Sequence, residues 1–414
     1  MTSRNLTLPA ARAAVPAATR ATYVAFIGSG FTFANWAARI PQVRDRFHLS
    51  SAQLGFVLLA IAVGSLVALP LAGVIVHRFG SRRTVAAMAV LAGVGLAIAA
   101  LGYLVGVPPV LAGLALFGFA NGAWDVAMNV QGAAVERRLG RAIMPRFHAG
   151  WSVGTVAGAL LGAGMVALAV PVTAHLLTVS VVSTLAVAVT ARGFLPDTDA
   201  DSAAGHPEPA PAHTAALRRW LESRTLLIGV IVLAFTLAEG AGNDWIAVSL
   251  IDGYQVPAAV STVGFAVFLA AMTAGRWFGP AYLDRYGRVT VLRVLAALAV
   301  GGIVLFSLGP WTPLAFAGAV LWGVGASLGF PVGMSAAADE PAAAAGRVSV
   351  VASIGYCAFL AGPPVIGFLG EHVTVLHALL LVAGLLSLAC VLTGAVRPLP
   401  PGDDQGVRSS PRAS

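Results

Sequence analysis

Charged side chains are scarce in this 414-residue sequence, and lysine is missing altogether. Only 10% of the residues are charged, whereas 58% are hydrophobic, and the mean hydropathy is +0.86. A water-soluble globule of this length needs more polar surface than this composition supplies. The composition therefore excludes a soluble globular protein and indicates an integral membrane protein.

All 25 basic residues are arginines. The guanidinium group keeps its charge under physiological conditions, so any proton carrier must be a carboxylic acid or a histidine. Chemistry that uses a lysine Schiff base is excluded. We find no His-x-x-x-His metal pair, serine elbow or phosphate-cradling loop beside a membrane face. We therefore expect neither an enzyme nor a cofactor.

Cysteine is also rare. Cys357 and Cys390 both fall in predicted membrane spans, where a lone cysteine behaves as a small apolar residue. The sequence predicts neither a disulfide nor a zinc site.

Long apolar runs fill most of the chain. About 20 apolar residues form a helix that crosses about 30 Å of hydrocarbon. We therefore predict an all-α polytopic membrane protein, and we expect the first run to be retained because it is too long for a removable signal peptide. About twelve spans are expected, near residues 21–41, 53–76, 83–104, 108–134, 147–169, 171–194, 225–251, 258–282, 289–309, 313–337, 347–369 and 373–396.

The arginines indicate how the spans are oriented. A cytoplasmic N-terminus puts 22 of the 25 arginines on inner segments and leaves only Arg39, Arg44 and Arg46 outside. This is the distribution that the positive-inside rule describes. We expect both termini in the cytoplasm and the protein in a bacterial inner membrane. The net charge of +8 is then explained without a nucleic-acid partner.

Two similar basic turns, residues 73–83 and 279–288, begin 206 residues apart. Gly150-Trp151 and Gly355-Tyr356 align at nearly the same offset. A repeat of this period in an apolar chain is typical of a membrane protein built from two parallel halves.

The repeat divides the chain into two six-helix bundles. A segment rich in proline, alanine and acids separates them and is typical of a solvated linker. The predicted parts are an N-terminal tail (1–20), an N-terminal bundle (21–195), a cytoplasmic linker (196–222), a C-terminal bundle (223–397) and a C-terminal tail (398–414).

The basic turns resemble the signature of the major facilitator superfamily, and the resemblance covers about residues 21–397. The resemblance implies that the residues of the two turns take part in gating. These residues are Gly73, His77, Arg78, Gly80, Arg82 and Arg83 in the first turn, and Asp284, Arg285, Gly287 and Arg288 in its degenerate copy.

Four further stretches, 124–129, 146–154, 239–245 and 355–364, are similar to one branch of that superfamily. It contains fucose-permease-like proteins and Mos-type proteins linked to rhizopine, an inositol derivative. The resemblance implies a transporter that rocks two halves about a central site.

The sequence departs from the family pattern in two places. His77 stands where the family usually has aspartate, so the resemblance does not supply the charge contact which that aspartate makes when the cytoplasmic side closes. Asp284 keeps the acid in the second half. The fifth span has Gly158-Ala-Leu-Leu-Gly162 where drug/proton antiporters typically carry Gly-Pro-x-x-Gly, and this weakens an efflux interpretation.

Polar residues in the fourth span are the first site candidates. Asn121, Asp125 and Asn129 are spaced i, i+4, i+8 and share one helical face. A charged acid at the centre of a membrane helix costs about 2.5–3.5 kcal/mol, so this face is expected to line a cavity where Asp125 binds protons or solute. The alternative is that Asp125 pairs with an arginine of a neighbouring helix and only stabilises the half.

The seventh span carries Glu239, Asn243 and Asp244 near mid-depth or beyond. Gly240 and Gly242 weaken the helix there, and bent helices at mid-depth are where transporters place their sites. We expect these polar residues to bind solute or protons. The alternative is a polar hinge that caps its own loosened backbone.

Aromatic side chains in the spans offer flat faces for a sugar or cyclitol ring. The candidates are Trp36, Trp151, Trp245 and Tyr356, with Asn35 beside the first of them. Packing or interfacial anchoring is the alternative for each aromatic residue.

Two charged or titratable residues lie at the ends of spans. Arg39, near the outer mouth, either steers an anionic solute or is only solvated. His148, at the cytoplasmic entry of the fifth span, either gates the path or titrates, or it caps a helix.

The expected function is secondary transport of a small polar solute, driven by protons through Asp125 or Glu239. The alternatives are proton-driven efflux and a sensor or assembly protein that has lost transport. We expect a monomer whose partners are its solute and the lipid bilayer.

Overall fold

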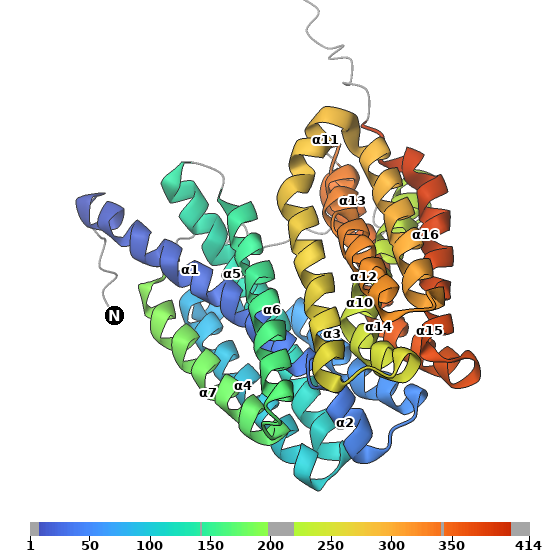
Figure 1. The fold of residues 1–414 in the computed structure, drawn as a ribbon. Helices are drawn as coiled ribbons and strands as arrows, with labels where there is room; N and C mark the ends of the chain where they lie inside the picture. The colour runs from blue at the N-terminus through green and yellow to red at the C-terminus, as the bar shows by residue number, and fades with distance from the viewer. Residues whose placement is uncertain (1–7, 141–142, 198–218, 341–342, 399–414) are drawn as a thin grey trace, which may run out of the picture.

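The computed structural model describes residues 8–140, 143–197, 219–340 and 343–398, and within these residues every regular element is a helix (Figure 1). The first half contains α1 (Leu8–Ala37), α2 (Ile40–Phe47), α3 (Ser51–Phe79), α4 (Ser81–Val105), α5 (Val107–Leu139), α6 (Met144–Ala167), α7 (Val172–Thr190) and η1 (Ala191–Gly193). The second half contains α10 (Ser223–Tyr254), α11 (Ala258–Leu308), α12 (Thr312–Ala326), α13 (Gly329–Ala337), α14 (Ala344–Val373), α15 (Val375–Ala378), α16 (Leu380–Leu392) and η3 (Thr393–Val396).

The helices account for the expected membrane spans. Ten of the described helical segments are long and apolar enough to cross a membrane. One of them, α11, has 51 residues and bends at Gly287, so it crosses twice. The 30-residue α1 is a further helix outside those ten. Ten segments with α11 counted twice, plus α1, give twelve spans, and the all-α polytopic prediction is confirmed.

The ends of the chain differ from the expectation in one respect. α1 begins at Leu8, inside the segment 1–20 that we predicted as an N-terminal tail, and Val15 and Ala18 are buried. Residues 1–7, 399–414 and most of the linker, 198–218, lie outside the described residues.

The two halves form a V in Figure 1. α1 packs against α6 and α3 against α5 in the first half, and α10 packs against α14 and α11 against α12 in the second. Between the halves the main contacts are α3 with α14 and α6 with α11. These pairs join the second span to the eleventh and the fifth to the eighth, so the repeat relates one pair to the other.

The two basic turns have nearly the same backbone. Gly80 has φ 79° and ψ 157°, and Gly287 has φ 76° and ψ 161°. Glycine adopts this positive-φ conformation without the steric cost that a side chain brings. The shared geometry, 207 residues apart in the chain, supports the duplicated architecture that the sequence predicted.

An acid from the end of the first half packs against the first basic turn. Asp197 Oδ2 accepts a hydrogen bond from the backbone N–H of Ser81 at 2.9 Å, and its Oδ1 accepts one from Ser81 Oγ at 2.5 Å. A carboxylate in this position satisfies a free N–H at the start of α4 and complements the helix dipole. The turn that has His77 in place of aspartate thus receives a carboxylate from Asp197, which we had assigned to the solvated linker.

The acid of the second turn makes no such contact here. Asp284 is exposed and has no ion pair among the described residues. Arg288 instead bonds Asp339 Oδ1 at 2.6 Å and Ser335 Oγ at 3.0 Å. The remaining arginines of the two turns are exposed, namely Arg78, Arg82, Arg83 and Arg285.

The halves meet at the end of the molecule that carries α2, which we call the α2 end. Arg44 of α2 forms an ion pair with Asp252 of α10. A methyl group built at Gly55 would overlap the carbonyl oxygen of Pro363, and one at Gly367 would overlap that of Ser51. α3 and α14 are therefore in backbone contact, and this end is closed.

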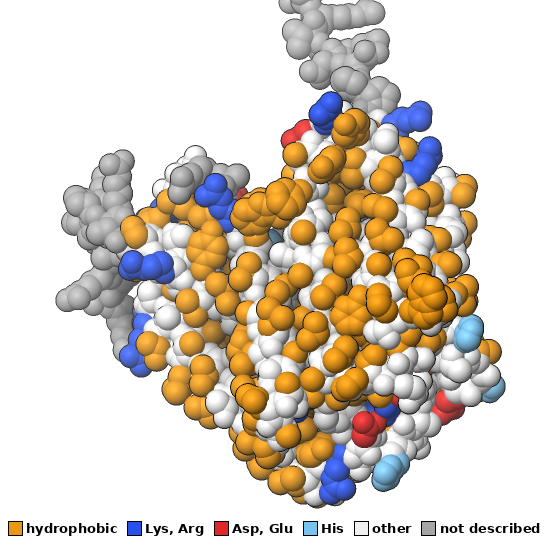
Figure 2. Space-filling view, viewed as in Figure 1, with side chains coloured by type: hydrophobic (Ala, Val, Ile, Leu, Met, Phe, Trp, Pro, Cys, Tyr) orange, Lys and Arg blue, Asp and Glu red, His pale blue; other side chains and the backbone are white. Residues whose placement is uncertain are grey.

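The opposite end carries the bend of α11 and the residues that flank the linker, and we call it the linker end. The ribbons of the halves diverge towards it in Figure 1, and Figure 2 shows a hollow between them there. Figure 2 also shows hydrophobic side chains over the middle of the molecule and arginines at both ends, as a membrane-spanning protein requires.

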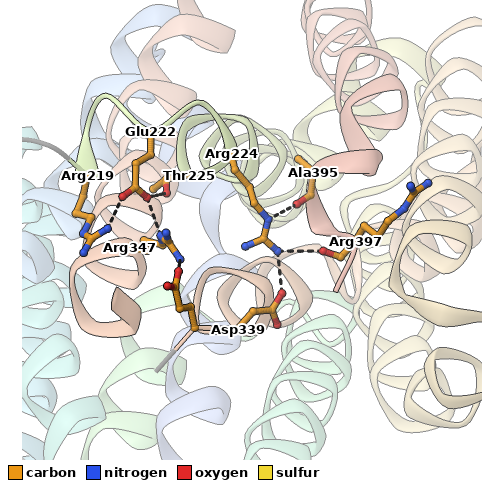
Figure 3. A network of polar contacts seen from close by, with 9 residues as sticks. Arg219, Glu222, Arg224, Thr225, Asp339, Arg347, Ala395 and Arg397 are labelled. Carbon is orange, nitrogen blue, oxygen red and sulfur yellow. Dashed lines mark hydrogen bonds and ion pairs between the residues drawn. The ribbon is translucent and has the colours of Figure 1, made fainter. Parts of the chain in front are cut away.

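A polar network covers the linker end of the second half (Figure 3). Glu222 accepts hydrogen bonds from Arg219, from Arg347 Nε at 2.6 Å and from Thr225 Oγ1 at 2.9 Å. Burial alone would raise the pKa of Glu222, but the bonds from Arg347, Arg219 and Thr225 outweigh it and lower the pKa to about 2. The network ties the chain before α10 to α14.

A second part of the same network holds the C-terminal end of the described chain. Arg224 Nη2 bonds Asp339 Oδ2 at 2.8 Å and the carbonyl oxygen of Arg397 at 3.1 Å, and Arg224 Nε bonds that of Ala395 at 3.1 Å (Figure 3). The start of α10, the chain after α13 and the end of η3 are therefore fixed to one another.

Replacing Asp252 tests the closed α2 end. Asp252→Asn removes the charge that Arg44 meets across the halves, so the closed state should become less populated. Spin labels can be attached at Arg46 and Gln255, which are both exposed, in a background without Cys357 and Cys390. The distance between the two labels should be longer and more broadly distributed in Asp252→Asn than in the parent protein. Asp45→Asn is the control, because Asp45 pairs with Arg44 within α2. Unchanged distances between the two spin labels in Asp252→Asn would contradict the prediction that the Arg44–Asp252 ion pair stabilises the closed end.

Replacing Glu222 tests the network in Figure 3. We expect Glu222→Gln to lower the melting temperature at neutral pH by about 1–2 °C, since two arginines lose their anion. The folded-state pKa, about 2, lies below the usual 4.5. The stabilisation should therefore be complete above pH 4.5 and disappear as the pH falls towards 2. A difference between the two proteins that grows on acidification would contradict this assignment.

Candidate functional site

Three polar residues of the fourth span, Asn121, Asp125 and Asn129, lie on α5. Asn129 Nδ2 donates to the backbone oxygen of Asp125 at 2.9 Å and to its Oδ1 at 3.3 Å. Asn121 Oδ1 accepts from Ser29 Oγ of α1 at 2.9 Å. One face of the helix therefore carries a carboxylate between two amides.

Asp125 has no cationic partner among the described residues. Its side chain is exposed although it lies near the middle of α5, and Asn129 is the only side chain that hydrogen-bonds it there. The alternative that Asp125 only pairs with an arginine of a neighbouring helix is therefore wrong for this conformation.

The second half faces Asp125 through Tyr356. This tyrosine lies near the middle of α14, is half-buried, and is within electrostatic reach of Asp125. His148 of α6 is likewise within reach of Arg276 of α11. Both pairs join one half to the other, so Asp125 lies on the side of α5 that faces the second half.

Glu239 is paired with an arginine. Arg276 Nη2 lies 2.8 Å from Glu239 Oε1 and 2.7 Å from Oε2, and Arg276 Nε donates to the carbonyl oxygen of Ser327 at 3.3 Å. The side chains of Glu239 and Arg276 are 14% and 27% exposed, so the pair is partly accessible. Glu239 is therefore one member of an ion pair in the candidate site.

Arg276 is not among the residues that the sequence predicts for the site. The arginine distribution assigns it to the inner segments, although it lies well inside the apolar run 258–282. Ionisable residues inside membrane spans usually pair with one another. An acid, Glu239, in the seventh span and an arginine, Arg276, in the eighth are therefore the sequence feature that could have predicted this ion pair.

The α10 helix is not interrupted at its glycines. It is continuous from Ser223 to Tyr254, so the backbone is not broken at Gly240 and Gly242. Gly242 instead packs closely on the ring of Phe268. The glycine is required for helix packing.

The other polar residues of α10 are unpaired. Asp244 is half-buried and has no hydrogen-bond or ion-pair partner among the described residues. Asn243 Oδ1 is buried without a hydrogen-bond partner in the same part of the chain. Asp125 and Asp244 are thus the acids of the predicted site that no cation of the described residues neutralises.

Several residues that we predicted to bind solute are buried between helices. Trp36 is 2% exposed, and Trp245 and Asn35 are 0% exposed, so none of them lines an open space in this conformation. Asn35 bonds the carbonyl oxygen of Phe31 and the ring of His175. The expectation that these three contact solute is not met here, whereas Trp151 is half-buried on α6.

His148 does not cap a helix. α6 begins at Met144, and its N-cap is Ile143. His148 is exposed one turn into the helix and packs edge-on against Phe26, with ring centroids 5.1 Å apart. The helix-cap alternative is therefore wrong.

Comparison with known proteins identifies relatives along most of the chain. The chain is 33% identical to the uncharacterized transporter y4wD of Sinorhizobium fredii over 390 residues, covering 91% of this chain and 98% of that protein. It is 31% identical to the membrane protein MosC of Rhizobium meliloti over 360 residues, covering 86% and 84%.

Solved structures share the fold at low sequence identity. The nucleoside transporter NupG superimposes with a TM-score of 0.70 at 15% identity, covering 91% of this chain and 98% of that chain. A variant of the Escherichia coli fucose:proton symporter FucP gives 0.59 at 14% identity, with 90% and 98% covered. The sequence profile of the Major Facilitator Superfamily matches residues 21–358. This chain therefore belongs to the major facilitator superfamily of membrane transporters and is not an enzyme.

Proposed function

We propose that this transporter moves a small polyhydroxylated solute, a sugar or a cyclitol, by alternating access coupled to protons. The observation that carries the proposal is Asp125. It is an exposed carboxylate at the middle of a membrane helix, lies between the two halves, and has one amide and no cation as its described partner. Such an acid can take up and release a proton without breaking an ion pair.

The polar groups around Asp125 support a hydroxylated solute. Asn121 and Asn129 supply amide donors and acceptors, and Tyr356 supplies a hydroxyl group and a flat ring. These groups bind neutral hydroxyls without a fixed charge. NupG is a nucleoside transporter and FucP a fucose:proton symporter, and both activities agree with a solute that carries a sugar ring.

The ion pair of α10 and α11 supports a role distinct from that of Asp125. Because Glu239 is neutralised by Arg276, protonating it would leave a cation unpaired inside the membrane. We assign the pair to solute binding and to stability of the second half. Proton coupling falls to Asp125, with Asp244 as the other unpaired acid of the described site.

The proposed orientation follows the arginine distribution. With both termini in the cytoplasm of a bacterial inner membrane, the linker end faces inward and the closed α2 end faces outward. The described conformation is then open to the cytoplasm. Alternating access would break the Arg44–Asp252 ion pair and close the linker end.

Transport by purified protein in proteoliposomes tests the proposal. We expect an inward proton gradient to accelerate accumulation of the sugar or cyclitol that binds. Asp125→Asn should reduce accumulation at least about tenfold, because a proton-coupled carrier loses its driving step. Solute exchange at equal pH needs no net proton movement and should persist. Export against the gradient would support efflux, and no flux of any candidate solute would support a sensor.

The matched control for Asp125 is Glu371, an exposed acid at the end of α14. Glu371→Gln makes the same change from acid to amide and should accumulate solute like the parent. Normal gradient-driven accumulation by Asp125→Asn would overturn the proton assignment.

A double variant tests the ion pair. Glu239→Gln and Arg276→Gln each leave one charge unpaired, and each should destabilise the protein by about 1–3 kcal/mol, less than a fully buried pair because Arg276 remains partly exposed. The double variant should melt above either single variant. Thermal unfolding in detergent measures this, and strictly additive losses would show that the two side chains do not stabilise each other.

A further inference from the structure

Arg39 is a buried cation at the α2 end that no acid of the described residues neutralises. It lies between α1 and α2 and is 2% exposed, so the alternative that it is only solvated is wrong. Its Nε donates to His175 Nδ1 at 2.9 Å, and its Nη2 donates to the carbonyl oxygen of Val170 at 3.0 Å. Its Nη1 has no hydrogen-bond partner within the described part of the chain.

The partner histidine adds no negative charge. Since Nδ1 of His175 accepts from Arg39, the ring proton lies on Nε2 and is donated to Asn35 Oδ1 at 2.8 Å. Asn35 in turn donates to the carbonyl oxygen of Phe31 at 2.8 Å. The cluster therefore carries one positive charge inside the protein, a strongly unfavourable arrangement unless a counter-charge is present.

A cavity of about 440 Å³ lies beside Arg39. Its polar lining comes from Arg39, Gln42, Tyr103 and Thr173, and Ala258 at the start of α11 adds a wall from the second half. Gln42 Oε1 is buried and has no hydrogen-bond partner among the described residues. Turning this amide by 180° places its NH₂ group at the same position, where it can donate a hydrogen bond.

We propose that this cavity binds a small carboxylate anion through the guanidinium group of Arg39. Guanidinium and carboxylate form strong, charge-assisted hydrogen bonds. Gln42 and Tyr103 offer further donors, and Val166 and Val172 in the cavity wall accommodate a short hydrocarbon chain. The site is separate from Asp125 and does not depend on the proposed transport function.

Thermal unfolding of the full-length protein in detergent, at constant ionic strength, tests the proposal. Sodium acetate and sodium butyrate replace sodium chloride stepwise, and sodium phosphate is a parallel arm. Because an anion that binds only the folded protein stabilises it, we expect the carboxylates to raise the melting temperature saturably by about 2 °C or more. Chloride and phosphate should not produce this shift.

Gln42→Glu makes the test specific to this cavity. It places a carboxylate beside Arg39 within the chain, so the variant should melt above the parent without added anion and should lose the response to acetate and butyrate. Arg46→Gln is the matched control, because Arg46 is exposed on the same α2 helix and its loss should leave the response intact.

Three results would overturn the proposal. They are the absence of a saturable carboxylate shift in the parent protein, an equal shift in Gln42→Glu, and a shift produced by phosphate but not by carboxylates. The last result would assign Arg39 to a phosphate group. Arg39→Gln gives a further measurement where it folds, since it should lack the response.

Discussion

An ionised side chain inside a bilayer must meet either water or a counter-charge, and the arrangement of this transporter depends on that requirement. The chain carries few charges, and those within its spans are expensive to leave in hydrocarbon. Asp125 meets the requirement by being exposed on the side of α5 that faces the second half. Glu239 meets it through Arg276. The divergence of the halves at the linker end and the polarity of their inner faces thus both serve to keep ionised side chains out of hydrocarbon.

The repeated architecture distributes this chemistry unequally. The two basic turns share a backbone conformation at Gly80 and Gly287, and the contacts between the halves follow the repeat. The charges do not follow it, because the exposed acid lies in the first half and the ion pair in the second. Under the proposed mechanism, such a duplicated scaffold would let Asp125 exchange protons while the Glu239–Arg276 pair keeps its charge.

Closure at the α2 end depends on backbone packing more than on charge. Glycines at positions 55 and 367 allow α3 and α14 to approach until side chains would collide. The Arg44–Asp252 pair is partly exposed, with side chains 13% and 46% accessible, and exposed ion pairs contribute little free energy. Close helix contact therefore supplies most of the stability of the closed end, and the ion pair sets which residues meet there.

The sequence by itself determined the membrane class, the number of spans, the duplication and the acids that lie within spans. These follow from composition and from spacing along the chain, which limit what hydrocarbon accepts. Only the tertiary structure decided which acid is neutralised, that Asp197 caps the turn that lacks its own aspartate, and that Trp245 and Asn35 are buried. The partners in these contacts come from different helices, and helix packing alone determines which side chains meet.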